Sequence, residues 1–316
     1  MRALNVPAAG EQPRLSDLPV PEATEDTVLV RVKAAGLNAL DNALAAGVMA
    51  EMLPHLYPLV LGRDAAGIVE AVGAGVDHVA VGDEVIGHML LAPPIQAGTL
   101  AEYALLPAAA VTRKPAGLSF TTAAALPLAA AAAKAAVDAV EPEQGQTVLV
   151  VGAGGGVGSY AVQLLAASGV TVVATGTAAD AGRLITLGAA TVVDYTAGPI
   201  AEQVHAAYPD GVDALIDLVA YTAEGAPLGA VRKGGKVAST LGAAADEQAL
   251  AAGGLTGTSV MAAPLREVVA ELAERAAAGT LKVDVTTVLP LEKATDGLAT
   301  LASGTARGKI VVEIGV

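Results

Sequence analysis

Residues 146–174, QTVLVVGAGGGVGSYAVQLLAASGVTVVA, constrain the fold of this chain more than any other segment. Thr147–Val151 is a short, apolar, β-branched run, which is typical of a strand buried on both faces of a parallel sheet. A glycine-rich run follows, then a helix-forming stretch at 159–168 and a second apolar run at 170–175. A strand, a glycine turn, a helix and a strand in this order form the unit that binds the pyrophosphate of a dinucleotide.

The glycine turn supplies the first candidate contacts to a cofactor. Glycine lets the backbone come close to the phosphates, and the exposed N–H groups at the start of the helix face them. A plain glycine-rich turn is the alternative, but the flanking strands and the helix in register favour the dinucleotide site. The candidate residues in the turn are Gly152, Gly155, Gly156, Val157 and Gly158.

Composition and charge exclude several classes of protein. A length of 316 residues suits two domains, and an aromatic content of 2% predicts a core of Ala, Val and Leu. A net charge of −14 argues against nucleic acid or an anionic membrane as a partner. The chain contains no Cys, which excludes disulfides and thiolate zinc sites. Because we find neither a signal-peptide pattern nor a membrane-spanning stretch, we expect a cytoplasmic protein.

The pattern of the chain changes near residue 118. Residues 1–117 contain short apolar runs between Gly, Pro and Asp turns, which predicts a β-rich unit with one short helix at 38–46. From 118 to 262, helices and apolar strands alternate, which predicts a doubly wound parallel sheet. Residues 263–316 return to a mixture of helix and strand. The strands expected in the doubly wound sheet are 147–151, 170–175, 189–194, 212–217, 236–240 and 256–261, with further helices at 180–187, 200–207, 222–231 and 246–252.

Eight motifs add a resemblance to a known family. They are VKAAGLNALD (32–41), LGRDAAGIVEAVGAGV (61–76), VGDEVIG (81–87), GTLAEYALLPAAAV (98–111), AALPLA (124–129), GVDALIDLV (211–219), VRKGGKV (231–237) and RGKIVVEI (307–314). In this order the chain resembles the medium-chain dehydrogenase/reductase superfamily, and within it the zinc-free, NADPH-dependent quinone oxidoreductase branch. The resemblance implies an α/β protein in which a GroES-like catalytic domain (1–117 and 263–316) accompanies a Rossmann domain (118–262), with the cofactor between them.

The same resemblance bears on metal and on the reacting end of the cofactor. Zinc-dependent relatives carry Cys where Asn38 stands and His where Arg63 stands, and neither residue here is a usual zinc ligand. We therefore expect no metal. The resemblance places Asn38 beside the nicotinamide, where its amide could donate to an acceptor oxygen as hydride arrives. The alternative is that Asn38 only caps the following helix. The other cofactor contacts that the resemblance implies are Tyr195, near the adenosine phosphate, and, on the nicotinamide side, Val219, Leu241, Gly242 and Lys309.

The end of the second strand bears on the choice of cofactor. An NAD-preferring site commonly has Asp or Glu there, bonded to the ribose 2′-hydroxyl. Here the strand end reads Thr175, Gly176 and Thr177, and the first acid, Asp180, is interpreted as an early-helix residue favoured by the dipole. With no carboxylate to repel a 2′-phosphate, and with two hydroxyls able to donate to it, we expect NADPH. Arg183 could add positive charge or be a solvated surface residue.

These observations lead to one main functional hypothesis and two alternatives. The main hypothesis is an NADPH-dependent reductase that transfers hydride to a small-molecule electron acceptor, a quinone or an α,β-unsaturated carbonyl compound. The alternatives are an enoyl reductase of a biosynthetic pathway and a non-catalytic NADPH-binding sensor or structural protein. Ala132 and Lys134 stand where the family usually has Thr and an aromatic residue, which predicts a roomier pocket or an altered substrate. His88 is a candidate proton donor, or simply a histidine at a strand end.

The resemblance also implies a homodimer. We expect it to form by pairing of the edge strands at 256–261, whose apolar exposed edge would otherwise be a liability.

Overall fold

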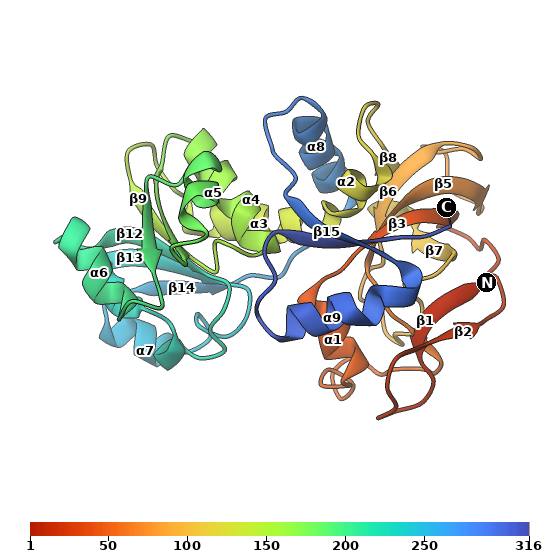
Figure 1. The fold of residues 1–316 in the computed structure, drawn as a ribbon, viewed down its shortest axis with the longest axis horizontal. Helices are drawn as coiled ribbons and strands as arrows, with labels where there is room; N and C mark the ends of the chain where they lie inside the picture. The colour runs from red at the N-terminus through yellow and green to blue at the C-terminus, as the bar shows by residue number, and fades with distance from the viewer. Residues whose placement is uncertain (316) are drawn as a thin grey trace. The chain divides into compact units, whose positions relative to one another are not determined.

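The computed structural model describes residues 1–315 and consists of two compact units. The first contains Met1–Ala131 and the chain from Pro264 onward, and the second is Ala132–Ala263. The sequence placed the first boundary earlier, at 117/118. The division falls later because helix α2 (Phe120–Ala124) packs on strands β3 (Thr27–Gly36) and β5 (Asp64–Val72) of the first unit. Helix α3 (Pro127–Val140) begins in the first unit and ends in the second. Figure 1 shows these elements along the chain.

Two sheets make up most of the first unit. The larger has seven strands in the order β15–β16–β3–β5–β6–β8, with β7 also paired to β3. Only the β15–β16 pair is parallel among the pairs formed by its described residues. The strands not yet given are β6 (Glu84–His88), β7 (Tyr103–Pro107), β8 (Val111–Arg113), β15 (Val285–Pro290) and β16 (Lys309–Glu313). The smaller sheet has the order β2–β1–β4, formed by β1 (Arg2–Val6), β2 (Arg14–Asp17) and β4 (Leu59–Val60).

Helices cover parts of the large sheet and enclose an aliphatic core. They are α1 (Ala39–Ala45), α8 (Arg266–Ala277) and α9 (Ala294–Ala302), together with α2 and the one-turn 3₁₀ segments η1 (Ala108–Ala110) and η4 (Leu291–Lys293). The core cluster joins distant parts of the sequence, since Val30, Leu61 and Ile310 are all buried within it. The segment after Pro264 therefore completes the sheet that the first part of the chain begins.

The second unit is a doubly wound parallel sheet, as the sequence predicted. Its strand order is β11–β10–β9–β12–β13–β14, and every neighbouring pair is parallel. The strands are β9 (Thr147–Val151), β10 (Thr171–Gly176), β11 (Thr191–Asp194), β12 (Val212–Asp217), β13 (Val231–Ser239) and β14 (Thr256–Ser259). Helices α4 (Gly156–Ala167), α5 (Ala181–Thr186), α6 (Ile200–Ala207) and α7 (Glu247–Ala252) lie between them in sequence. The α/β fold class with GroES-like and Rossmann parts is confirmed.

Two local expectations were wrong. The helix expected at 222–231 is replaced by two 3₁₀ turns, η2 (Ala223–Gly225) and η3 (Leu228–Ala230), because Pro227 between them lacks an N–H and would clash with the preceding helical turn. The edge strand expected at 256–261 ends at Ser259, and its four residues, Thr-Gly-Thr-Ser, are all exposed. This edge of the sheet is therefore polar rather than apolar.

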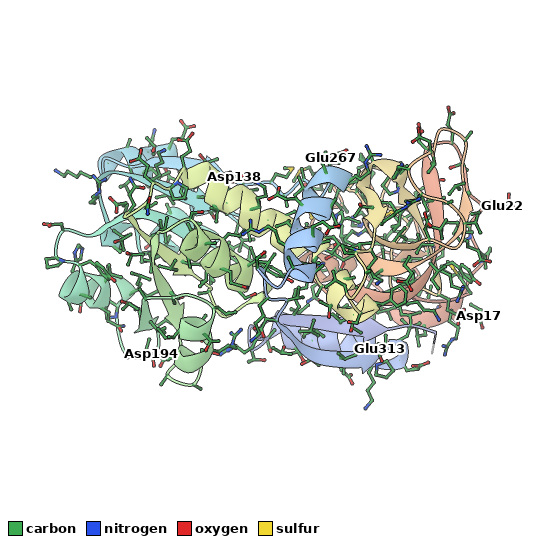
Figure 2. The ribbon with its side chains drawn as sticks, turned by 90° about the horizontal axis from the view of Figure 1, so that it is seen from above. Asp17, Glu22, Asp138, Asp194, Glu267 and Glu313 are labelled. Atoms are coloured by element: carbon green, nitrogen blue, oxygen red, sulfur yellow. The ribbon has the colours of Figure 1, made fainter. Side chains whose placement is uncertain are left out.

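Acidic side chains lie on the surface of both units. Figure 2 labels six of them, of which Asp17, Glu22, Glu267 and Glu313 belong to the first unit and Asp138 and Asp194 to the second. Among residues 1–315, no helix has both the length and the apolar character needed to cross a bilayer.

Candidate functional site

A row of polar residues crosses one end of the large sheet in the first unit. Its members are Lys309, Asn38, Asp64 and His88. The register pairs Val311 of β16 with Gly36 of β3, Gly36 with Asp64 of β5, and Asp64 with His88 of β6. Four neighbouring strands therefore begin or end at the same level. Because the polar residues stand at these strand ends, residues far apart in the sequence come within hydrogen-bond distance of one another.

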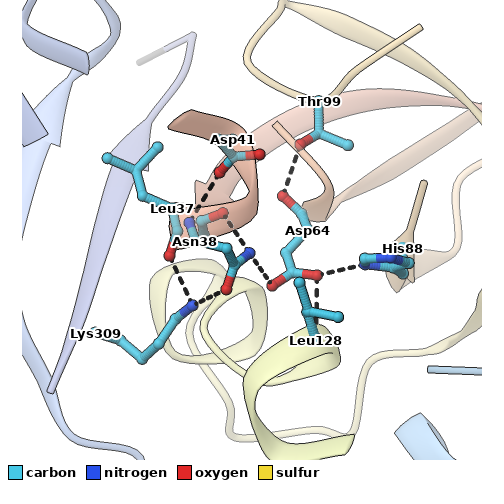
Figure 3. A network of polar contacts seen from close by, with 9 residues as sticks. Leu37, Asn38, Asp41, Asp64, His88, Thr99, Leu128 and Lys309 are labelled. Atoms are coloured by element: carbon cyan, nitrogen blue, oxygen red, sulfur yellow. Dashed lines mark hydrogen bonds and ion pairs between the residues drawn. The ribbon is translucent and has the colours of Figure 1, made fainter. Parts of the chain in front are cut away.

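Asn38 lies at the centre of this row and binds residues on both sides (Figure 3). Its Oδ1 accepts a hydrogen bond from Nζ of Lys309 at 2.7 Å, and its Nδ2 donates to Oδ2 of Asp64 at 2.8 Å. Nζ of Lys309 also donates to the carbonyl oxygen of Leu37 at 2.8 Å. Asn38 and Lys309, two residues that the sequence singled out separately, are thus brought together.

Asp64 organises the other half of the row. Its Oδ1 lies 2.7 Å from Nδ1 of His88 and accepts a hydrogen bond from the backbone N–H of Leu128 at 3.1 Å. Leu128 is in the first turn of α3, where the helix dipole favours a carboxylate. The backbone carbonyl of Asp64 accepts from Oγ1 of Thr99 at 2.9 Å. The carboxylate is held on three sides and is fully buried.

The start of α1 distinguishes the two roles considered for Asn38. Asn38 occupies the N-cap position, but the cap is made by Asp41, whose Oδ2 accepts from the backbone N–H of Asn38 at 2.8 Å. The Asn38 amide turns away from the helix toward Asp64 and Lys309, with a longer bond to the carbonyl of Gly36 at 3.4 Å. The Asn38 side chain therefore binds Asp64 and Lys309 and does not cap the helix.

The row is part of a buried cluster of charges. Asp41, Arg63, Asp64 and Lys309 are each 3% exposed or less. Burial raises the pKa of Asp41 to about 6, although the Asn38 N–H and the charge of Arg63 favour its ionised form. Burial lowers the pKa of Lys309 and of Arg63, and in both cases Asp41 and Asp64 partly counter the effect. Within the described residues, Oδ1 of Asp41 and Nε of Arg63 have no hydrogen-bond partner.

This cluster does not fit a zinc ion. His88 and Asp64 are the two residues of the row that could coordinate a metal, and they bond to each other. The Lys309 ammonium and the Arg63 guanidinium in the same cluster would repel a cation. In the part of the chain that the structure describes, no group of three or more His, Cys, Asp or Glu residues is arranged to hold a metal ion.

In the second unit, the candidate cofactor residues gather at the carboxyl ends of the parallel strands. The turn from β9 to α4 carries Gly152, which has φ = +82°, in the left-handed region that glycine adopts without strain. A Cβ at Gly158 would lie 2.3 Å from the carbonyl oxygen of Gly152, so only glycine allows the helix to pack on the turn. At Gly155 a Cβ would meet one atom, at 3.4 Å, which leaves open space over the turn. This cradle fits the pyrophosphate of a dinucleotide.

The remaining residues that the sequence assigned to the turn and to the nicotinamide side also lie at this edge. Gly156 and Val157 begin α4, whose first N–H groups have no partner inside the helix. Val219, after β12, packs against Gly152, since a Cβ on that glycine would lie 2.8 Å from Cγ2 of Val219. Gly242 donates its N–H to the carbonyl of Ala220 at 3.2 Å, and the preceding Leu241 is 42% exposed.

Two strand-end residues that sequence reasoning missed hold these loops. Asp217 ends β12 and is fully buried, and its Oδ1 accepts from the N–H groups of Val219 at 3.0 Å and Ala220 at 2.7 Å. Ser239 ends β13, and its Oγ accepts from the N–H of Leu241 at 3.2 Å. A small polar residue directly after a buried apolar strand is the sequence signal that could have found both.

The loop after β10 differs from the expectation in two respects. Thr175 is buried, and its Oγ1 accepts a hydrogen bond from the Gly152 N–H at 3.0 Å, so it supports the glycine turn. Asp180, the first acid after β10, stands at the N-cap of α5, at the start of a helix as expected, but it also contacts the loop that follows the strand. Oδ2 of Asp180 accepts from Oγ1 of Thr177 at 2.8 Å and from its N–H at 3.1 Å. A Cβ on Gly176 would lie 2.6 Å from Cδ1 of Leu184. Tyr195, just beyond β11, is 48% exposed.

Comparisons with known proteins agree with the fold. Residues 24–116 match the model described as "Alcohol dehydrogenase GroES-like domain", and residues 187–312 match "Zinc-binding dehydrogenase". The chain is 32% identical over 306 residues to 2-methylene-furan-3-one reductase of Solanum lycopersicum, covering 94% of this chain and 74% of the relative. It is 31% identical over 304 residues to the chloroplastic NADPH-dependent alkenal/one oxidoreductase of Arabidopsis thaliana, with the same coverage.

Two solved structures share the whole architecture. An NAD-dependent alcohol dehydrogenase superposes with a TM-score of 0.88 at 32% identity, covering 100% of both chains. The quinone oxidoreductase of Coxiella burnetii gives a TM-score of 0.89 at 26% identity, covering 99% of this chain and 98% of the other. The chain belongs to the medium-chain dehydrogenase/reductase superfamily. It is an oxidoreductase with a site for a nicotinamide cofactor.

Proposed function

We propose that this protein reduces quinones or α,β-unsaturated carbonyl compounds with a nicotinamide dinucleotide as hydride donor. The observation that carries the proposal is the cradle at Gly152–Gly158, which is closed at Gly158 and open at Gly155. The names of the tomato and Arabidopsis relatives and of the Coxiella structure support this acceptor class.

The chain's own residues have defined tasks in this proposal. Gly152, Gly155, Gly156, Val157 and Gly158 hold the pyrophosphate with backbone N–H groups and the positive end of α4. Val219, Leu241 and Gly242 form the nicotinamide side of the same edge. The bound cofactor supplies the hydride. The protein orients the cofactor and the acceptor and supplies the electrostatic environment.

The buried row of the first unit holds a fixed cation. Nζ of Lys309 is held by Leu37 and Asn38, which fixes one ammonium in a dry environment. Such a fixed donor stabilises an oxygen that gains negative charge during reduction. Because the Asn38 amide hydrogens are given to Asp64 and Gly36, we propose that Asn38 positions Lys309, in place of the direct donor role expected from the sequence.

An open pocket of about 670 Å³ lies in the second unit. Gly242 and Tyr221 line it together with three acidic residues, Glu224, Asp246 and Glu247. Because like charges repel, this rim disfavours anionic ligands there.

Cofactor preference, assembly and location complete the proposal. The Arabidopsis relative is named NADPH-dependent and one structural relative NAD-dependent, so their names leave the preference open. The sequence predicts NADPH, and the contact of Asp180 with Thr177 argues against that preference. We propose a homodimer and a cytoplasmic location, as expected from the sequence.

A panel assay tests the function. Purified protein is given NADH or NADPH with neutral quinones, neutral enones and one enoyl thioester, and oxidation of the cofactor is followed by its absorbance. We expect acceptor-dependent oxidation with the neutral compounds. Tight binding of cofactor with no turnover on any acceptor would instead identify a non-catalytic binding protein.

A further inference from the structure

The loop after β10 stands where a dinucleotide-binding sheet meets the adenosine ribose. In such sheets the residues at the carboxyl end of the second strand contact the ribose 2′-position. Here β10 is that strand, since it lies beside β9 and precedes α5. The groups that this loop offers decide between a 2′-hydroxyl and a 2′-phosphate.

Asp180 lies directly beside the end of β10. A Cβ built on Gly176, the last residue of the strand, would come within 3.2 Å of Cβ of Asp180. The carboxylate accepts hydrogen bonds from both the N–H and the hydroxyl of Thr177. The Thr177 hydroxyl, which the sequence offered as a phosphate donor, therefore gives its hydrogen to Asp180.

A second carboxylate takes the next donor of the loop. Oδ2 of Asp194, the last residue of β11, accepts from the N–H of Ala178 at 3.1 Å. The hydroxyl and N–H of Thr196 also bind Asp194, and these bonds lower the pKa of the carboxyl group, so it is ionised at neutral pH. The two consecutive backbone N–H groups that could cradle a phosphate, those of Thr177 and Ala178, thus point at carboxylates.

The positive charge near the loop does not balance this pair. Arg183 is the one basic residue between 177 and 190, and its Nη2 lies 3.8 Å from Oδ1 of Asp180 and donates to the carbonyl of Gly154 at 2.8 Å. From Thr177 to Thr196 the sequence carries two carboxylates and one basic residue, a net charge of −1. A 2′-phosphate would add negative charge to it, whereas a ribose hydroxyl adds none and can donate a hydrogen bond.

We infer that Asp180, together with Asp194, makes this site prefer NADH to NADPH. The inference rests on the proposed function, because it concerns the cofactor of that same site. It assigns Asp180 as a specificity-determining residue that acts through its charge and by occupying the donors of Thr177. Asp180 follows the end of β10 by several residues in the sequence. Its contacts with Gly176 and Thr177 nevertheless place it next to the strand end.

Binding measurements on the intact protein test the inference without turnover. The dissociation constants of NADH and NADPH are measured by nicotinamide fluorescence, for the wild type and for Asp180→Asn, Asp194→Asn and Asp210→Asn. Asparagine keeps an oxygen acceptor for the Thr177 N–H, so Asp180→Asn removes the charge and preserves the shape of the turn. Asp210 is exposed in the turn before β12, at the opposite end of the sheet, and this variant controls for the change in net charge.

We expect the wild type to bind NADH about tenfold or more tightly than NADPH, because one unit charge at close range near a protein surface changes a binding constant by at least that factor. Asp180→Asn and Asp194→Asn should each reduce the ratio severalfold to tenfold, and Asp210→Asn should leave it unchanged. Raising the ionic strength should also reduce the wild-type ratio, since salt screens the repulsion of the phosphate.

Other outcomes separate this inference from the proposed function. Equal or tighter binding of NADPH by the wild type, or a ratio that neither loop variant changes, would overturn the inference and leave the reductase proposal standing. Failure of the folded wild type to bind either cofactor would overturn both.

Discussion

Asn38 separates two opposite charges that are both buried. Its carbonyl oxygen faces the Lys309 ammonium and its amide nitrogen faces the Asp64 carboxylate, so its dipole is aligned with both. Hydrogen bonds to charged groups contribute more than those between neutral groups, and a buried charge that loses its partner costs more still. One neutral side chain therefore stabilises two ions that burial disfavours.

The first prediction follows from these bonds. Asn38→Ala should lower the free energy of unfolding by about 3 kcal/mol, because two charged groups lose a partner. It should also lower kcat with little change in the dissociation constant of the cofactor. Asn42→Ala in the same helix is the matched control. It removes one hydrogen bond from a side-chain amide to the carbonyl of Leu298 and should lower the free energy of unfolding by about 1 kcal/mol. Chemical denaturation and steady-state rates measure both variants, and equal losses would show that the charges do not matter.

The second prediction concerns pH. The pKa of Asp41 is raised from 3.8 to about 6 in the folded protein, so the folded state binds a proton more tightly than the unfolded chain. Stability from this group is thus full below about pH 4 and is lost as the pH rises through 6. Relative to wild type, Asp41→Asn should gain about 2 kcal/mol between pH 4 and pH 7. Denaturation curves across this range test it, and a constant difference between the two proteins would contradict it.

At the scale of elements, two glycines of the turn before α4 differ in how much space surrounds them. Gly155 has open space around its Cα, while Gly158 is pressed against the backbone of Gly152 and Ala153. Gly155→Val should therefore abolish cofactor binding in a protein of normal stability. Gly158→Val should lower the melting temperature as well, because the helix must move off the turn. Thermal melts and a fluorescence titration of the cofactor distinguish the effects of the two variants. If Gly155→Val retains its affinity for the cofactor, the turn does not bind the phosphates.

The edge strand β14 allows a test of the proposed dimer. The N–H of Val260 donates to the carbonyl of Ser239, so by the alternation of a strand the N–H of Ser259 faces the open edge. Ser259→Pro removes that outward donor and leaves the ladder to β13 intact. We expect this variant to sediment as a monomer at concentrations where Ser259→Ala remains dimeric. A dimer that survives the proline does not use this edge.

The elements that could be predicted from sequence are those whose own residue pattern indicates whether they are buried. The buried strands β9 and β12 were predicted to the residue because each is a closed apolar run. The charged row could not be predicted, because Asn38, Asp64, His88 and Lys309 meet only through the register of four strands. Asp180 was correctly expected at the start of a helix, but its contacts with Gly176 and Thr177 could not be predicted, for a related reason. Its distance along the chain concealed a turn that brings it back to Gly176.

At the scale of the whole molecule, the charge distribution bears on metal dependence. The chain matches a model described as zinc-binding, yet its buried cluster contains Lys309 and Arg63. We expect activity to survive dialysis against a chelator, and metal analysis to find zinc far below one equivalent. Stoichiometric zinc, with activity lost on chelation and restored by zinc, would contradict this.

The inserted second unit imposes an order on biosynthesis. Ala132–Ala263 is continuous, so its parallel sheet can close on the ribosome as soon as that stretch has emerged. The first unit must wait, because β15 and β16 are translated after the insertion and Lys309 opens the last strand. Until then Asn38 and Asp64 have no cationic neighbour from β16. A nascent chain halted before residue 309 would thus carry a finished dinucleotide cradle in its second unit and an unfinished charged row in its first.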